Sequence, residues 1–173
     1  MSDSTGSVLV LIVLVFASAY FSATETAFSS MNKIRLRSLA NNGNRHAALA
    51  LSISEDYDKL LTTILVGNNV VNIGSTALAT LLFTKWLGDA GASLSTIVMT
   101  VTVLIFGEIT PKSVAKDMPD QFAMFSAPFL NALIKILTPI NFIFSCWKKL
   151  IRRLIKMCIR DSSDVRRFEH VVF

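Results

Sequence analysis

The stretch LLTTILVGNNVVNIGSTALATLLF, Leu60 to Phe83, is an apolar block that carries several short polar side chains. As a helix it is long enough to cross the hydrocarbon layer of a bilayer, which is roughly 30 Å thick. Two further apolar blocks flank it in the sequence, Ser7 to Phe28 and about Ala92 to Ile109. The three blocks predict three membrane-spanning helices.

The composition agrees with a membrane protein. Hydrophobic residues make up 52% of the chain and charged residues only 17%, and the mean hydropathy is +0.54. This is too apolar for a typical soluble domain. The 173 residues suffice for one compact bundle of a few spans, so the predicted fold class is an all-α membrane protein. The net charge of +5 does not indicate nucleic acid, because the basic residues flank apolar segments, where they contact membrane lipid and set topology.

The distribution of Lys and Arg predicts the orientation. The connection between the first two blocks holds five basic residues, whereas the second connection holds only Lys85; the five are Lys33, Arg35, Arg37, Arg45 and Lys59. By the positive-inside rule the first connection is cytoplasmic and the amino terminus lies outside. The leader MSDSTGS has an acid and no Lys or Arg, so the first block is expected to be a span and not a signal peptide.

A fourth apolar region, Phe122 to Trp147, is interrupted by Pro128 and Pro139 and carries Lys135. If it crossed the membrane, the basic stretch KKLIRRLIKM, residues 148–157, would lie outside. We therefore expect a broken juxtamembrane belt helix at the cytoplasmic side. The basic stretch places its apolar residues on one helical face, as an interfacial amphipathic helix does, and the carboxy terminus is expected in the cytoplasm.

Each predicted span carries a patch of oxygen-bearing side chains: Ser22, Glu25, Thr26 and Ser29 on the first, Asn68, Asn72 and Ser75 on the second, and Glu108 on the third. Pro111 lacks an N–H and is expected to break the third helix, which would free carbonyls near Gly107. Hard cations such as Mg²⁺ and Na⁺ prefer such oxygen ligands. The alternative is that the hydroxyls bond their own helix and the amides only join helices.

Three motifs, YFSATETAFSS, LLTTILVGNNVVNIGST and FGEITPKSVA, resemble the membrane domain of the CNNM/CorC family of magnesium transporters, whose bacterial members are also called hemolysin-like. The match runs in order from about Ala19 to about Trp147. The resemblance implies a homodimer with three spans and a belt helix in each subunit. It also implies Mg²⁺ efflux across the plasma membrane, or the inner membrane of a bacterium, with sodium as the coupled ion. The implied ligands are Ser22, Asn68, Asn72 and Glu108, with Gly67 and Gly107 giving carbonyls or clearance, and Glu25 as a weaker candidate.

Members of that family continue into cytoplasmic CBS domains that bind nucleotide. We expect a transmembrane domain over residues 1–157 and a short polar tail over 158–173, with the CBS region absent, so nucleotide binding is not assigned to this chain. One alternative is a membrane scaffold or regulator whose polar patches only pack helices. A second is a pore-forming protein, which would need a soluble or secreted state. We do not expect an enzyme, because the sequence shows no nucleophile and base set, phosphate loop or pair of metal-ligand histidines.

Overall fold

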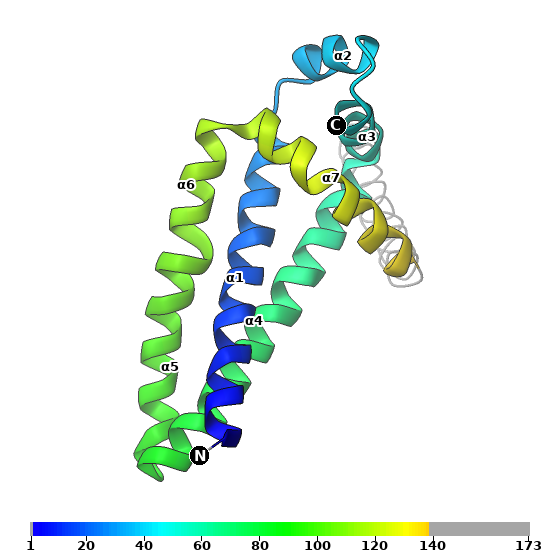
Figure 1. Cartoon of the computed structure of the whole chain (residues 1–173). Coiled ribbons are helices and arrows are strands. Elements are labelled where there is room, and N and C mark those ends of the chain that lie inside the picture. The colour runs from blue at the N-terminus through cyan, green and yellow to red at the C-terminus, as the bar shows by residue number, and fades with distance from the viewer. Residues whose placement is uncertain (1, 139–173) are drawn as a thin grey trace, which may run out of the picture. The chain divides into compact units, whose positions relative to one another are not determined.

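The computed structural model describes residues 2–138, with side chains from Thr5 onward. The chain forms two compact units, Met1–Ile134 and Lys135–Phe173, and the described residues of the second include the last turn of helix α7. The described part is helical, with short turns (Figure 1). In chain order its elements are α1 (Ser2–Ser30), α2 (Lys33–Asn41), α3 (Arg45–Glu55), α4 (Tyr57–Leu87), α5 (Ala90–Thr102), the π-helix η1 (Val103–Ile109), α6 (Thr110–Asp117) and α7 (Pro119–Ile136).

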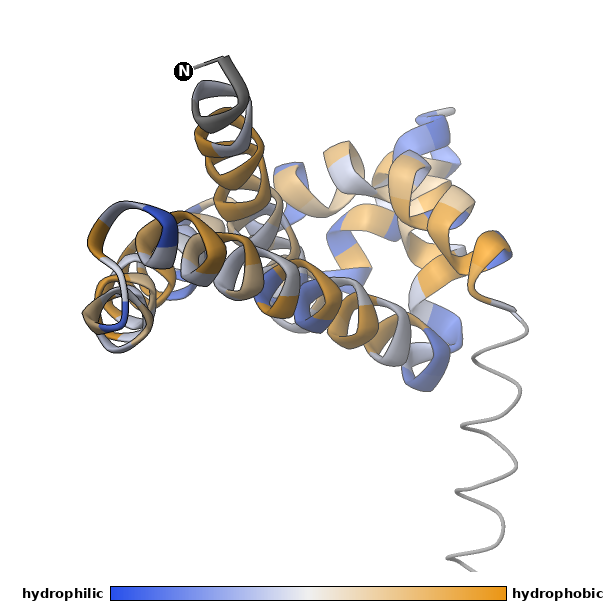
Figure 2. Ribbon diagram, turned by 90° about the horizontal axis from the view of Figure 1, so that it is seen from below, coloured by the Kyte–Doolittle hydropathy of each residue, from blue (hydrophilic) through white to orange (hydrophobic). Residues whose placement is uncertain are grey.

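Within the described residues, three helical stretches are long and apolar enough to cross a membrane: Thr5–Ser30, Tyr57–Leu87 and Ala90–Asp117. This confirms the prediction of an all-α membrane protein with three spans. The chain runs along α1, returns along α4 and runs back through α5, η1 and α6 (Figure 1). Large apolar side chains such as Phe16 and Leu81 are exposed on these helices, which are predominantly orange in Figure 2. In a membrane such a surface faces lipid or another protein.

A tight turn joins α4 to α5. Gly88 closes α4 with a φ of 67°, a conformation that favours glycine. A Cβ placed on Gly91 would lie 2.3 Å from the carbonyl oxygen of Phe83, so only glycine allows the two helices to approach so closely there. The two spans therefore form an antiparallel hairpin.

The third span differs from the prediction. We expected it to end near Ile109 with a break at Pro111, and this is wrong, because helical backbone continues through α6 to Asp117. The chain instead widens into a π-helix just before the proline, and the N–H of Thr110 bonds the carbonyl of Ile105, five residues back. Proline removes one backbone donor and crowds the preceding turn, and a π-bulge relieves this crowding without ending the helix.

The buried core lies at the end of the spans where α2, α3 and α7 gather (Figure 1). Its fully buried large side chains include Leu36 of α2, Leu60 and Ile64 of α4, and Leu130 of α7. Two asparagines start the short helices: the Asn32 side chain accepts from the N–H groups of Ile34 and Arg35, and that of Asn44 caps α3 in the same way. The short helices thus close one end of the bundle.

Helix α7 also differs in part from the prediction. Pro128 lies inside a continuous helix, so the expected interruption at this proline is wrong. Tyr20 of α1 packs its ring edge-on against Phe129 and donates its hydroxyl to the carbonyl of Ser126 at 3.4 Å. These contacts seat the helix beside α1. Pro139, the basic stretch 148–157 and the tail 158–173 lie outside the described residues.

Asp120 fastens the start of α7 to the start of α2. Its side chain accepts a hydrogen bond of 2.8 Å from the Asn32 N–H and lies 3.6 Å from the Arg35 guanidinium. Asp120 is only 8% exposed, whereas the Arg35 side chain is 70% exposed. The buried hydrogen bond is therefore the stronger of the two contacts.

Replacing Asp120 by Ala is expected to lower the free energy of unfolding by about 1 to 3 kcal/mol, because the Asn32 N–H then loses its partner. Arg35→Gln is the matched control and should cost less than about 1 kcal/mol, since exposed ion pairs contribute little. Thermal unfolding of the purified protein in detergent checks both. Equal losses in the two variants would show that the ion pair, and not the buried hydrogen bond, fastens α7.

Candidate cation site

Ser18 joins the three spans. It is fully buried, and its hydroxyl donates to the Asn68 side-chain oxygen of α4 at 3.3 Å. On its other side lies Gly107 of η1, where an added Cβ would be 2.9 Å from the Ser18 Oγ. One small polar side chain thus contacts the neighbouring spans on both sides. Sequence analysis did not single out Ser18, although its position four residues before Ser22 places both on one helical face.

Two buried oxygens near this contact have no hydrogen-bond partner within the described residues. They are the Ser22 Oγ and the Asn72 Oδ1. Ser22 is 1% exposed, so its hydroxyl is not in contact with bulk solvent. Buried polar atoms are nearly always hydrogen-bonded, and an unpaired one calls for an explanation such as a bound ion or water. These two atoms are the strongest structural indication of a cation site in the spans.

The two unpaired oxygens lie on opposite sides of the Ser18 to Asn68 contact. Ser22 follows Ser18 by four residues on α1, and Asn72 follows Asn68 by four residues on α4. Because the two helices are antiparallel, these two steps run in opposite directions. At 1.5 Å per residue each step is about 6 Å, so Ser22 and Asn72 sit at different depths. The structure therefore arranges the predicted ligands in series along the spans and not as one closed cage.

Other hydroxyls of the predicted patches bond their own helices. Thr26 donates to the Ser22 carbonyl at 3.2 Å, and Ser29 donates to the Thr26 carbonyl at 3.0 Å. Ser75 donates to the Asn72 carbonyl at 2.9 Å, and Thr76, which lies outside the predicted patches, does the same. For these side chains the alternative considered above, local bonding within a helix, is what the structure shows.

Glu108 lies beside a different part of α4. It is partly buried and lines a hollow of about 250 Å³ between α4 and the third span. Thr76 and Thr100 contribute the other oxygens of this hollow. Thr76 also lines a neighbouring hollow that includes Asn72. The structure thus relates Glu108 to Asn72 through Thr76, a residue that the sequence analysis did not select.

Glu25 forms an ion pair with a residue of the third span. Its Oε2 lies 3.4 Å from the Lys112 Nζ, and the two side chains are 30% and 39% exposed. Sequence analysis did not select Lys112 as a site residue. The ion pair places a positive charge close to one of the two carboxylates that were proposed as ligands.

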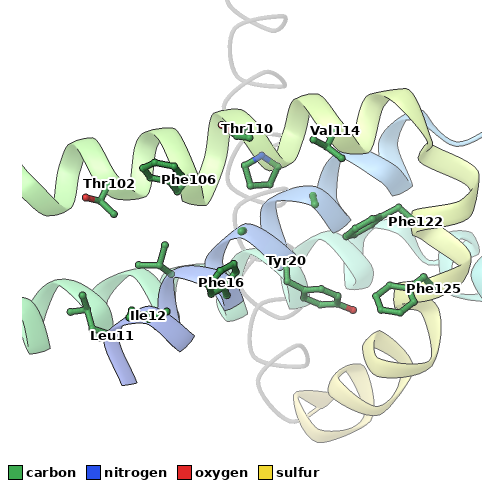
Figure 3. Close-up of a pocket in the computed structure, with 14 residues that line it drawn as sticks. Leu11, Ile12, Phe16, Tyr20, Thr102, Phe106, Thr110, Val114, Phe122 and Phe125 are labelled. Atoms are coloured by element: carbon green, nitrogen blue, oxygen red, sulfur yellow. The ribbon is translucent and has the colours of Figure 1, made fainter. Parts of the chain in front are cut away.

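A larger groove lies on another side of α1. It has a volume of about 710 Å³ and is bounded by α1, the third span and the start of α7 (Figure 3). Most of its labelled side chains are apolar, including Phe16, Phe106 and Phe125. Because it offers few oxygens, it is unsuited to a metal ion.

The oxygen-bearing residues suit a hard cation. Among the described residues no group of three or more His, Cys, Asp or Glu side chains converges as a metal site. The available groups are hydroxyl and amide oxygens with two carboxylates, Glu25 and Glu108. Gly67 adds clearance, since an added Cβ there would lie 2.6 Å from the Phe21 ring. The assignment of individual ligands stays a prediction.

Replacing Gly107 by Ala is expected to destabilise the bundle by about 1 to 3 kcal/mol, because the new methyl would overlap the Ser18 hydroxyl. Adding Ser18→Ala should restore part of the loss, since the clash at 2.9 Å is then removed and the Ser18 Cβ stays at 3.5 Å. Gly74→Ala is the control, because nothing lies within 4 Å of a Cβ there. Thermal unfolding in detergent measures all three. No rescue by the second substitution would contradict this packing.

Comparison with known proteins identifies the family. The sequence profile of the Cyclin M transmembrane N-terminal domain, CNNM, matches residues 9–169. The UPF0053 protein of Haemophilus influenzae is 38% identical over 157 residues, which cover 91% of this chain and 37% of that protein. The UPF0053 inner membrane protein YfjD of Escherichia coli is 36% identical, covering 80% of this chain and 32% of that protein.

The name of a more distant relative states a function. The Polyamine export protein of H. influenzae is 23% identical, over 87% of this chain and 38% of its own length. The chain thus spans between 32% and 38% of the length of these three relatives. With three spans, the motifs quoted above and a profile match over most of its length, the chain belongs to the CNNM transmembrane domain family.

Proposed function

We propose that this domain transports Mg²⁺ across the plasma membrane, or the inner membrane of a bacterium, in the direction of efflux and coupled to sodium. The observation that carries the proposal is the pair of buried, unpartnered oxygens of Ser22 and Asn72. Leaving such groups unpaired in a membrane interior is costly, and an entering cation would pair them. Membership of the CNNM family supports an ion as the substrate.

The arrangement of the predicted ligands in series along the spans suits transport of a cation better than its storage. Mg²⁺ gives up water reluctantly, so successive oxygens that replace a few waters at a time lower the cost of entry. Neutral hydroxyl and amide groups bind weakly enough to release the ion, and Glu108 supplies negative charge beside the path. The π-helix gives the Glu108 turn a geometry that can tighten or relax, and π-bulges often mark functional sites.

We further propose a membrane orientation and an oligomeric state for the domain. We place the amino terminus outside and the short helices α2 and α3 in the cytoplasm, because these helices carry most of the basic residues between the first two spans. We also propose a homodimer. The hollow beside Glu108 is open, with Thr76 and Thr100 exposed, and a carboxylate facing lipid is unfavourable. A second copy would cover it.

Export of an organic polycation is a second candidate. The observation that favours it is the contact of the Lys112 ammonium with Glu25, which shows that this carboxylate accommodates an alkyl ammonium group. The name of the Polyamine export protein agrees with such a substrate. Spermidine binding that exceeds Mg²⁺ binding under equal ionic strength would favour this candidate.

Calorimetric titration of the purified protein with Mg²⁺ tests the first proposal. We expect binding in the parent and a loss of at least about tenfold in affinity, or about 1.4 kcal/mol, in each of Ser22→Ala, Asn72→Ala and Glu108→Gln. Asn69→Ala is the matched control, because Asn69 lies on the same span with an exposed side chain. Size-exclusion chromatography verifies that all variants keep the parent's assembly.

Unchanged Mg²⁺ binding in the three site variants would show that these residues only pack the helices. It would then favour the alternative of a membrane scaffold. Equal loss in Asn69→Ala would point to general damage of α4. Flux into liposomes, with and without a sodium gradient, then decides whether the bound ion moves and whether sodium drives it.

A further inference from the structure

Lys112 is a charged side chain within a membrane-spanning helix. Inside the three spans, away from their ends, the charged side chains are Glu25, Glu108 and Lys112. Lys112 follows Glu108 by four residues in the third span. Its ammonium reaches across to Glu25 on α1, 3.4 Å away. It is therefore a positive charge tethered beside the carboxylates of the proposed cation path.

The charge balance of the spans changes when a divalent ion enters. With Lys112 in place, two carboxylates and one ammonium leave a single negative charge. Adding Mg²⁺ would leave one positive charge in a region of low dielectric constant, where an uncompensated charge is costly. If Lys112 moves out as Mg²⁺ moves in, two carboxylates face two positive charges and the region is neutral.

Lys112 has a route to water. Its side chain is 39% exposed and that of Glu25 is 30% exposed, so the pair lies at the edge of the bundle and not in its centre. A lysine can keep its aliphatic stem along an apolar surface while its ammonium reaches water. Glu25 lies one helical turn after Ser22, whose buried hydroxyl has no hydrogen-bond partner in the described part of the chain. Release of Lys112 would therefore free a carboxylate next to an unpaired oxygen.

We propose that the Lys112 ammonium is a tethered counter-ion, which occupies Glu25 when the path is empty and is displaced to the aqueous edge when Mg²⁺ enters. This inference rests on the proposed transport of Mg²⁺. It gives Glu25 a role that a simple ligand would not have, because the carboxylate exchanges one cation for another. It also gives the domain a means of keeping its spans closed without substrate, since the pair joins α1 to α6.

The first test is site-resolved acylation of lysines in the purified full chain, followed by mass spectrometry with and without Mg²⁺. Choline chloride keeps the ionic strength equal, because salt alone weakens an ion pair. We expect Mg²⁺ to raise the labelling rate of Lys112 several-fold and to leave that of Lys116 unchanged. Lys116 is a matched control: it lies on the same helix, is exposed, and has no ion pair among the described residues. In Glu25→Gln, Lys112 should label fast in both conditions.

The second test is calorimetric. Lys112→Gln should tighten Mg²⁺ binding by about three- to tenfold, since the competing ammonium is gone, whereas Lys116→Gln should not. In the double variant Glu25→Gln with Lys112→Gln this gain should disappear.

The outcomes separate the two proposals. If the parent binds Mg²⁺ but Lys112 labelling does not change, or if Lys112→Gln binds no more tightly, the counter-ion inference is wrong and the proposed transport stands. If the parent binds no Mg²⁺ and Lys112 labelling does not respond, both are wrong.

Discussion

The contact between Ser18, Asn68 and Gly107 is the constraint on which the arrangement of the spans depends. A buried serine on α1 bonds an amide on α4 and fills the space that a side chain at Gly107 would need. In a membrane the helices gain little from burying apolar surface, so small residues and interhelical hydrogen bonds determine where they meet. Because Gly107 lies in the π-helix, this contact also determines the position of the widened turn that carries Glu108.

The polar groups lie at different depths, or levels, along the spans, on either side of this contact. Ser22 lies beyond it toward the short helices, and Asn72 lies beyond it toward the other end of the bundle. Each level offers a few oxygens and none offers the full octahedral set that would hold Mg²⁺ tightly. Under the proposed function, such an arrangement would favour exchange between partly occupied levels, which a transporter requires.

The buried core and the candidate cation site lie in different parts of the chain. The apolar core and the Asp120 hydrogen bond lie where α2, α3 and α7 close the bundle. The unpaired oxygens and the interior charges lie along the spans, where many large side chains are exposed. The Glu25 to Lys112 pair lies between these regions. A change of charge at this pair could therefore alter the packing of the spans while the closed end keeps its structure.

The sequence by itself determined the three spans, the family and the types of residue in the site, because long apolar runs and short polar motifs are local properties of the chain. It also indicated Ser22 and Asn72 by their helical spacing, and Glu108 by its place between Gly107 and Pro111. Only the tertiary structure showed that Ser18 joins the spans, that Pro111 widens a helix and does not end it, and that Lys112 pairs with Glu25. Each of these depends on how neighbouring helices are aligned in depth, and that alignment arises from side-chain fit between segments far apart in the sequence.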